Sequence, residues 1–250
     1  MTVLTNNAML RIWEIGEALH PVDQALIVLR EAFPDKSWEE LARLSPGRRN
    51  DFLLTIRERT FGKRLHGLST CHRCGKGFEF IAEADELRME AMAGKEGDHQ
   101  NYELEWGECK MMLRMFDSFD LGAAADCPDL ESARALLAER AIVKLVCNGK
   151  EMPPGHLSQG GVDAISKKMS ECDPNANMKI DVECPECGGE LSILFDILSF
   201  LWKEISAHAR RLLYEVAILA RYYAWREADI LSLSSARRHY YLEIAETGAR

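Results

Sequence analysis

Several features that would place this chain in a familiar class are missing. Its longest apolar run, near Leu191–Trp202, is interrupted by Asp196 and is too short to span a bilayer. The N-terminal segment carries Glu14 and Glu17 and has no small-residue cleavage pattern, so it does not resemble a signal peptide. Positive charge is also scarce, because 40 acidic residues against 31 basic ones give a formal charge of −9. We therefore expect no membrane partner and no nucleic-acid binding driven by overall charge.

The sequence motifs of common enzyme classes are absent as well. We find no His-Glu-x-x-His, no Gly-x-Ser-x-Gly, no phosphate-binding glycine loop followed by Lys and Ser or Thr, and no dinucleotide fingerprint. The 250 residues are 47% hydrophobic and 28% charged, which is typical of a globular protein with one large domain or two ordinary ones. We expect a folded protein without enzymatic activity.

Four of the eight cysteines form two pairs with the same sequence pattern. Segments 71–75 and 184–188 both have the sequence Cys-x-x-Cys-Gly, and each precedes an alternating, strand-like run. In a knuckle of this kind both thiolates point to one site, and two knuckles supply the four soft ligands of a closed tetrahedral zinc site. We therefore predict a structural Zn²⁺ ion without an open position for a catalytic water. The expected ligands are Cys71, Cys74, Cys184 and Cys187.

Other roles for the cysteines stay open. A thioredoxin-type redox pair lies at a strand-to-helix junction, whereas both pairs here precede strands, and an iron–sulfur cluster would also use four thiolates. His72 could replace one cysteine as a ligand, or it could simply be solvated. Without an export signal, the remaining cysteines are expected to be reduced and buried as small apolar side chains. They are Cys109, Cys127, Cys147 and Cys172.

Hydrophobic periodicity predicts helical ends and a mixed centre. Helical spacing runs through the first 62 residues, with helix starts at Ser37 and Ser45 and a stop at Gly62. It returns over Leu198–Tyr223, and two short helices are expected after it. In the centre, we expect strands at 78–81, 102–106, 111–115, 178–182 and 191–195, and helices at 128–147 and 158–172.

These patterns predict an α+β fold that is mainly helical. We expect a split, four-cysteine zinc β-knuckle centre, helical N- and C-terminal arms, and a small inserted α/β module. The expected parts are an N-terminal arm at 1–66, a knuckle centre at 67–195, a hairpin-plus-helices module inserted at 98–176, and a C-terminal arm at 196–250.

The two helical ends repeat one pattern. Segments 41–53 and 230–242 each contain a helix, a turn with Ser, a double arginine and an aromatic–aliphatic pair. A helical hairpin could reuse these residues without a shared role. Because arginine and aromatic side chains dominate protein interfaces, we consider the most prominent of them candidate partner-binding residues. They are Arg48, Arg49, Trp225, Arg237, Arg238 and Tyr241.

A basic stretch at residues 43–64 is opposed only by Asp51 and Glu58. Beside a zinc ribbon it could bind nucleic acid. It could also be a solvated face, or dock the acidic stretch at 79–108 of the same chain. We favour the last two interpretations and keep a zinc-ribbon nucleic-acid-binding or regulatory protein as the alternative function.

Several longer segments suggest a family. They are Ser-Pro-Gly-Arg-Arg at 45–49, the two cysteine knuckles, Phe-Asp-Ile-Leu-Ser-Phe-Leu-Trp-Lys-Glu-Ile at 195–205, and the helical segment at 214–234. With these, the chain resembles the T-even-family baseplate hub assembly chaperones of contractile phage tails and extracellular contractile injection systems. The resemblance covers about residues 25 to 245.

The resemblance implies a non-enzymatic assembly or structural protein of a contractile, tail-like baseplate. Its expected partners are baseplate or tail-tube proteins, and its expected location during assembly is the cytoplasm. The resemblance leaves open whether the protein then stays in a phage-tail-like particle. The resemblance also implies that the four paired cysteines are metal ligands and that the segment 225–242 is a docking element.

Overall fold

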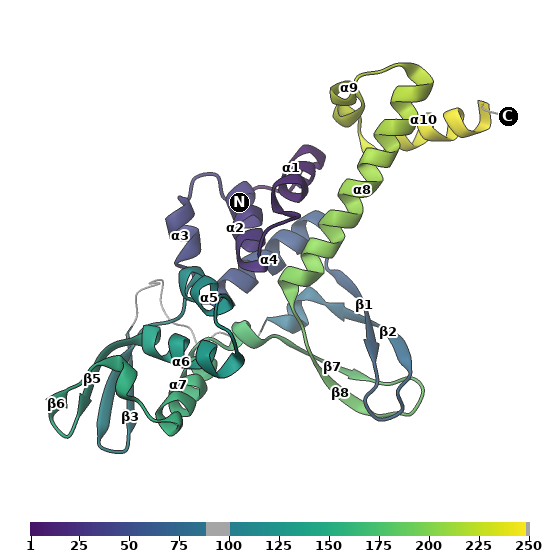
Figure 1. Ribbon diagram of the computed structural model, residues 1–250. Helices are drawn as coiled ribbons and strands as arrows, with labels where there is room; N and C mark the ends of the chain where they lie inside the picture. The colour runs from purple at the N-terminus through teal and green to yellow at the C-terminus, as the bar shows by residue number, and fades with distance from the viewer. Residues whose placement is uncertain (89–100, 249–250) are drawn as a thin grey trace.

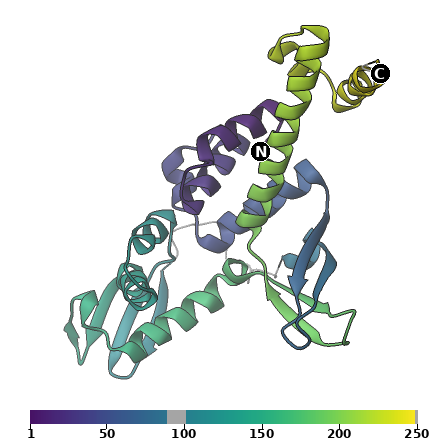
Figure 2. The ribbon, with the colours of Figure 1, turned by 45° about the vertical axis from the view of Figure 1, so that its right-hand side comes forward.

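The computed structural model describes residues 1–88 and 101–248, and it has groups of elements arranged around a helical centre (Figure 1). Helices from both ends of the chain build the centre. Two β-hairpins extend from it on one side, and helices with a small sheet extend on another (Figure 2). The predicted class, mixed α+β with a four-cysteine cluster drawn from two separate segments, is confirmed.

The N-terminal helices begin and end where the sequence supplies capping residues. The Ser37 hydroxyl accepts a hydrogen bond from the N–H of Glu40, whose carboxylate accepts one from the N–H of Ser37. Ser45 caps the next long helix, Pro46 is its first residue, and Gly62 ends it at a φ of 96°. These positions agree with the prediction. The helices are α1 (Asn6–Gly16), α2 (Pro21–Ala32), α3 (Trp38–Ala42) and α4 (Pro46–Phe61).

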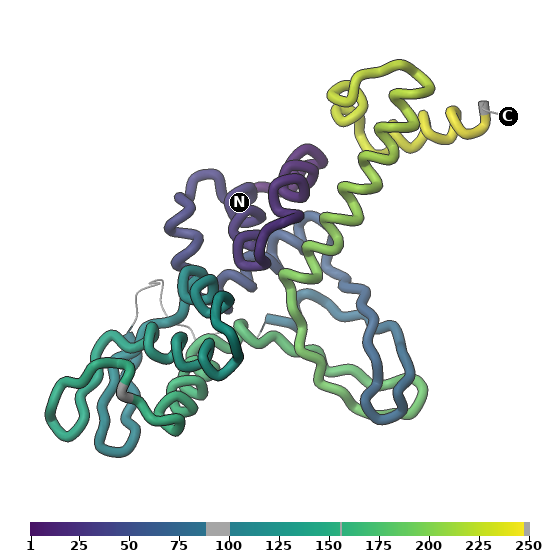
Figure 3. The backbone as a smooth tube through the Cα atoms, in the orientation of Figure 1, coloured from purple at the N-terminus to yellow at the C-terminus, as the bar shows by residue number. Residues whose placement is uncertain are grey.

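The long helix α8 (Ile197–Tyr223) connects the centre to the C-terminal helices. Its first half packs against α1, α2 and α4, and Leu201 and Ile205 are fully buried in the core they share. Arg57 of α4 donates two hydrogen bonds to Glu204 of α8, at 2.9 and 2.7 Å. The second half of α8 extends beyond this core, and α9 (Glu227–Ser232) and α10 (Ser235–Gly248) pack against its far end (Figure 3).

The two hairpins are built from segments that lie far apart in the sequence. Strand β1 (Arg64–Thr70) pairs with β2 (Gly77–Glu83), and β7 (Lys179–Glu183) pairs with β8 (Glu190–Leu194), both antiparallel. Apolar side chains pack between the two hairpins. Phe78 and Leu191 are buried there, and Phe80, Val182 and Ile193 pack around them.

The sequence pattern does not predict strand β1, because Leu65 and Leu68 are its only large apolar residues. The strand forms through its pairing with β2 along its whole length, with Leu65 opposite Ala82 and Gly67 opposite Phe80. A glycine is needed at position 67, since a Cβ atom there would lie 2.2 Å from Cζ of Phe80. Tertiary pairing therefore supplies a strand that local propensity does not specify.

Most of the segment between the hairpins forms a module with its own apolar core. Its antiparallel sheet has the strand order β3-β4-β5-β6, and α6 and α7 share the core with the sheet. The predicted hairpin at 102–115 and helix at 158–172 are confirmed. The elements are β3 (Tyr102–Trp106), β4 (Cys109–Leu113), α5 (Ser118–Ala125), α6 (Leu130–Ala141), β5 (Ile142–Cys147), β6 (Lys150–Glu151) and α7 (Gln159–Cys172).

The predicted helix at 128–147 is wrong in its last part. Helix α6 ends at Ala141, and the β-branched residues that follow form β5 between β4 and β6. Asn148 and Gly149, which the sequence suggests as a helix stop, form the β5–β6 hairpin turn with φ values of 51° and 75°. A short apolar run cannot be divided between helix and strand by periodicity alone.

The expectation that Cys109 and Cys147 are separate reduced thiols is also wrong, because they form a disulfide. The register between β4 and β5 places these two residues directly opposite one another, with Cα atoms 4.0 Å apart. The sequence does not predict this pairing, because a helix over 128–147 contains no strand that could place residue 147 opposite Cys109. Cys127 and Cys172 are free and half-buried rather than fully buried.

The module is tied to the helical centre through α4. The backbone N–H of Gly47 donates to Asp173 at 2.7 Å, and the Asn50 side chain donates to the carbonyl of Asn175 at 3.2 Å. The described 3₁₀ helices are η1 (Ala84–Leu87), η2 (Pro154–His156) and η3 (Pro174–Asn177). None of the helices in residues 1–88 and 101–248 combines the length and the apolar character needed to cross a bilayer.

Candidate metal centre

Each cysteine pair lies in the turn of one hairpin, and the two turns have the same backbone hydrogen bonds. The N–H of Gly75 donates to the carbonyl of Cys71 at 2.8 Å, and the N–H of Gly188 donates to that of Cys184 at 2.9 Å. Both glycines have positive φ, at 74° and 63°, a conformation that most other residues avoid. The Cys-x-x-Cys-Gly pattern therefore specifies a turn that directs both thiols of a pair to one side.

The packed hairpins bring the two turns together at their tips (Figure 1). The Sγ atoms of Cys71 and Cys187 lie 3.7 Å apart, and those of Cys74 and Cys184 lie 3.8 Å apart. All four Sγ atoms lie within 4.8 Å of one another, and all four thiols are free. Cys71 and Cys184 are buried, whereas Cys74 and Cys187 are exposed at the tip.

These distances can be compared with those of known sulfur chemistry. A tetrahedral site with Zn–S distances of about 2.3 Å has sulfur–sulfur edges of about 3.8 Å. A disulfide would require about 2.05 Å. The separations of 3.7 and 3.8 Å match the edge of a zinc tetrathiolate. The geometry therefore fits a four-coordinate metal ion held by sulfur alone.

The electrostatics of the cluster differ between its members. The backbone N–H groups of Cys74 and Arg73 lower the pKa of Cys71 to about 6, so its thiolate, the form that binds metals, is accessible at neutral pH. The N–H of Gly189 lowers the pKa of Cys187, but desolvation and the neighbouring sulfurs outweigh it and raise this pKa to about 11. Four sulfurs at this distance cannot all carry negative charge unless a cation lies among them.

The surroundings of the cluster leave it with cysteine ligands only. His72 is exposed, and the group of described residues that could hold a metal ion contains the four cysteines without it. Lys76 and Glu186 form an ion pair between the two turns at 2.6 Å, but both side chains are mostly exposed and the pair contributes little stability. Each cysteine pair precedes a strand, as expected, so neither has the strand-to-helix setting of a thioredoxin-type site.

The predicted partner-binding arginines lie in two distant places that share one geometry. Arg48 and Arg49 open α4, and Arg237 and Arg238 open α10, at the far end of α8 (Figure 1). In each pair the N–H of the first arginine donates to a serine hydroxyl at 3.3 Å, from Ser45 and Ser234 respectively. The first arginine of each pair is exposed and the second is buried.

The two buried arginines have different partners. Arg238 is 1% exposed and donates to Glu215 at 2.6 Å and to the carbonyl of Leu233 at 3.0 Å. Burial lowers the pKa of Arg49, and the charges of Asp196 and Asp173 partly offset this effect. Only the exposed member of each pair is free to contact another molecule directly.

The predicted aromatic residues lie together in the C-terminal arm. Trp225 stacks on Tyr223 with ring centroids 4.6 Å apart, and Tyr241 meets Trp225 edge-on at 4.9 Å. Both Trp225 and Tyr241 are half-buried, since they pack against the apolar core of this arm and leave only part of their surface accessible. Tyr222 and Tyr240, which flank this cluster, are more exposed, at 45% and 63%.

Much of the basic stretch at 43–64 is neutralised within the chain. Arg57 pairs with Glu204, Lys63 with Asp85 and Arg64 with Glu83. The acidic stretch at 79–108 therefore pairs with part of the basic stretch, which is one of the two interpretations favoured from the sequence. The part of that acidic stretch at 89–100 lies outside the described residues.

Comparison with known proteins gives one match. A family model described as T4 bacteriophage base plate protein matches residues 22–202, which is most of the chain. The matched span includes both cysteine pairs and the first part of α8, and it ends before α9 and α10. No curated protein and no solved structure matches the chain.

Proposed function

The chain belongs to the T4 bacteriophage base plate protein family, and we propose that it is a zinc-stabilised, non-enzymatic protein that works through protein–protein contacts in building a contractile tail-like baseplate. The observation that carries this proposal is the combination of the family match with the four-cysteine cluster. Phage tails and the related contractile injection systems are the settings in which such a protein would act. During assembly it would be cytoplasmic.

Zinc is the proposed ion because of the donor set. Four thiolates select soft or borderline metals, and a closed tetrahedral shell is typical of structural zinc. The ligands would be Cys71, Cys74, Cys184 and Cys187, two from each hairpin. A shell of this kind has no open position, so the metal would stabilise the fold and would not activate water.

The energetic need for a metal follows from the small size of the hairpins. A two-stranded hairpin is marginally stable alone, and the apolar cluster between β1–β2 and β7–β8 is small. Structural zinc in small peptides contributes about 10–16 kcal/mol of binding free energy that is coupled to folding. The ion would join the hairpins and thereby fix how the chain enters and leaves the inserted module. We retain the proposed division at 1–66, 67–195 with the insertion 98–176, and 196–250.

The partner-binding surface is proposed at the two exposed arginines and the aromatic arm. Arg237 and the accessible parts of Trp225 and Tyr241 lie in the C-terminal arm, and Arg48 lies at the start of α4. Arg49 and Arg238 would act indirectly, by holding these helix starts in place. Baseplate and tail-tube proteins are the proposed partners.

Co-expression tests this function. The chain should form a stable complex with at least one baseplate or tube protein of a contractile particle, and the double variant Arg48→Glu with Arg237→Glu should weaken that complex. Lys167→Glu, an exposed change on α7, is the matched control and should bind normally. Failure to associate with every baseplate and tube component, both after co-expression and in purified particles, would overturn the proposal.

A further inference from the structure

A groove of about 430 Å³ lies between the start of α2, the start of α3 and helix α5, away from the cysteine cluster. Two aromatic side chains line it and remain half accessible, Trp38 at 42% and Phe119 at 48%. Gly122 and its small neighbours in α5 also line it. Large aromatic surfaces left accessible beside a concave floor are typical of binding sites for apolar side chains.

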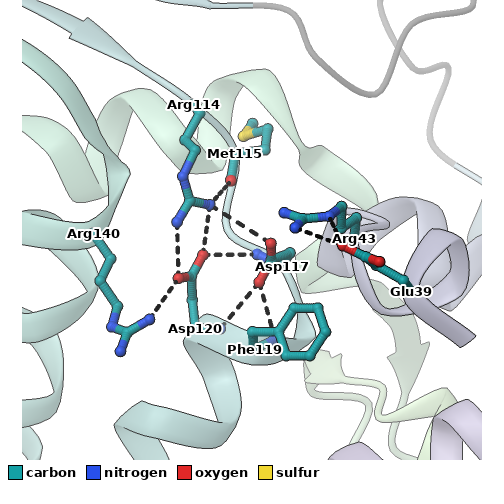
Figure 4. Close-up of polar contacts among 8 residues, drawn as sticks. All are labelled: Glu39, Arg43, Arg114, Met115, Asp117, Phe119, Asp120 and Arg140. Carbon is teal, nitrogen blue, oxygen red and sulfur yellow. Dashed lines mark hydrogen bonds and ion pairs between the residues drawn. The ribbon is translucent and has the colours of Figure 1, made fainter.

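The groove wall formed by α5 is held rigidly (Figure 4). Arg114 donates to both oxygens of Asp120 at 2.7 and 2.9 Å, and Arg140 donates to the same carboxylate at 3.4 Å. The carboxylate of Asp117 accepts from the N–H groups of Phe119 and Asp120 and caps the helix. The start of α5, including the Phe119 backbone, is therefore fixed before any ligand binds.

One feature of α5 has no explanation within the described fold. Gly122 lies inside the helix, where glycine is unfavourable, and nothing described lies within 4 Å of the place its Cβ would occupy. Packing does not require a glycine there. The open floor at Gly122 therefore leaves room for a side chain of a binding partner.

The rim of the groove carries two carboxylates, of which Asp23 lies in the first turn of α2, where the helix dipole favours an acidic side chain. Asp23 and Asp126 line it, and neither forms an ion pair within the described part of the chain. Asp126 caps the C-terminal end of α5, where the helix dipole disfavours an acidic side chain. The nearby Arg43 is already paired with Glu39 and lies over the Phe119 ring, 5.8 Å from its centroid.

We propose that this groove binds a segment of a partner protein that presents an apolar side chain next to a lysine or arginine. The apolar side chain would lie between Trp38 and Phe119 on the open floor at Gly122. The cation would lie between Asp23 and Asp126. The inference rests on the proposed function only in taking the partner to be a baseplate protein.

A random peptide library provides a test that does not depend on knowing the baseplate partner. The full-length protein should enrich peptides in which an aromatic or aliphatic residue neighbours a basic one. Resynthesised peptides should bind Gly122→Leu at least about tenfold more weakly, as measured by fluorescence polarisation. The double variant Asp23→Asn with Asp126→Asn should also bind these peptides more weakly than the wild type does, and the affinity of the wild type for them should fall with added salt.

The matched control is Ala135→Leu, which introduces the same side chain at an exposed position of α6 outside the groove and should leave peptide affinity unchanged. Circular dichroism of each variant separates loss of binding from loss of fold. The proposal is overturned if no peptide prefers the wild type to Gly122→Leu, if the enriched peptides are acidic, or if the groove instead mediates self-association that Gly122→Leu abolishes. Peptide failure with intact baseplate association would overturn this inference alone.

Discussion

Cys71 and Cys187 stand 116 positions apart in the sequence, yet their Sγ atoms lie 3.7 Å apart. Each belongs to a different hairpin, and a shared apolar cluster together with the turn backbones brings the hairpin tips together. A pair of sulfurs at this distance is too far apart for a disulfide and well placed for two ligands of one metal ion. The inserted module lies between these two cysteines in the sequence, so the contact brings together the hairpins that precede and follow the module.

Cys184→Ser should lower the stability of the hairpin region, because a buried metal ligand is lost. We expect a loss on the order of several kcal/mol in urea unfolding of the metal-loaded protein, and a similar loss when a strong zinc chelator is added to the wild type. Cys127→Ser, which changes a free cysteine outside the cluster, should alter stability by less than about 1 kcal/mol. Equal unfolding curves for Cys184→Ser and Cys127→Ser would contradict the metal site.

The disulfide between Cys109 and Cys147 should make the inserted module sensitive to reductant. It closes a loop over a sequence separation of 38, and its loss should cost about 2–4 kcal/mol. Hydrogen exchange of β4 and β5 should therefore rise in Cys109→Ser or in dithiothreitol, while the metal-loaded hairpins keep their protection. If reductant leaves exchange in β4 and β5 unchanged, this disulfide does not stabilise the module.

The buried ion pair between Arg238 and Glu215 should control the stability of the C-terminal arm. Arg238→Ala leaves the mostly buried Glu215 carboxylate with the weaker Arg211 pair at 3.6 Å, and the change should cost up to about 3 kcal/mol. Limited proteolysis should then cut α10 faster, with little change in the helical centre. Arg237→Ala removes an exposed neighbour and should alter stability by less than about 0.5 kcal/mol. Equal cleavage rates for the two variants would argue against this structural role.

Asp120 should make the module less stable in acid. Burial alone would raise its pKa, but hydrogen bonds from Arg114, the N–H of Asp117 and Arg140 outweigh burial and hold the pKa below its usual value. A lowered folded-state pKa adds stability above the ordinary carboxyl pKa, and that stability is lost as pH falls toward the folded value. The module should therefore unfold at lower urea near pH 3 than near pH 5. Asp120→Asn should remove part of this pH dependence, and an unchanged pH profile would contradict it.

The parts of the structure that the sequence predicts correctly are those with local signals. The caps at Ser37, Ser45 and Gly62 have their effect within one helical turn, and each Cys-x-x-Cys-Gly knuckle specifies its own turn. The long apolar stripe of α8 is likewise visible in any short window. The sequence therefore identifies the four cysteines of the cluster, although it does not show that they lie together.

The features that the sequence does not predict depend on contacts between distant segments. Strand β1 forms by pairing with β2, and β5 becomes a strand because it lies between two others. The Cys109–Cys147 disulfide follows only from that sheet register. Burial of Arg49 and Arg238 is hidden in sequence because their exposed neighbours Arg48 and Arg237 are the same residue type. The groove at Phe119 has no motif, since its walls come from α2, α3 and α5.

Metal content is the most direct test of the central claim that four thiolates from two hairpins hold one ion. The wild-type protein, purified with reductant and without chelators, should contain about one zinc per chain by elemental analysis, and it should be colourless. Cys184→Ser should lose that zinc, whereas Cys127→Ser should keep it. Wild-type protein without stoichiometric metal, visible absorbance of an iron–sulfur cluster, or full zinc content in Cys184→Ser would contradict the account.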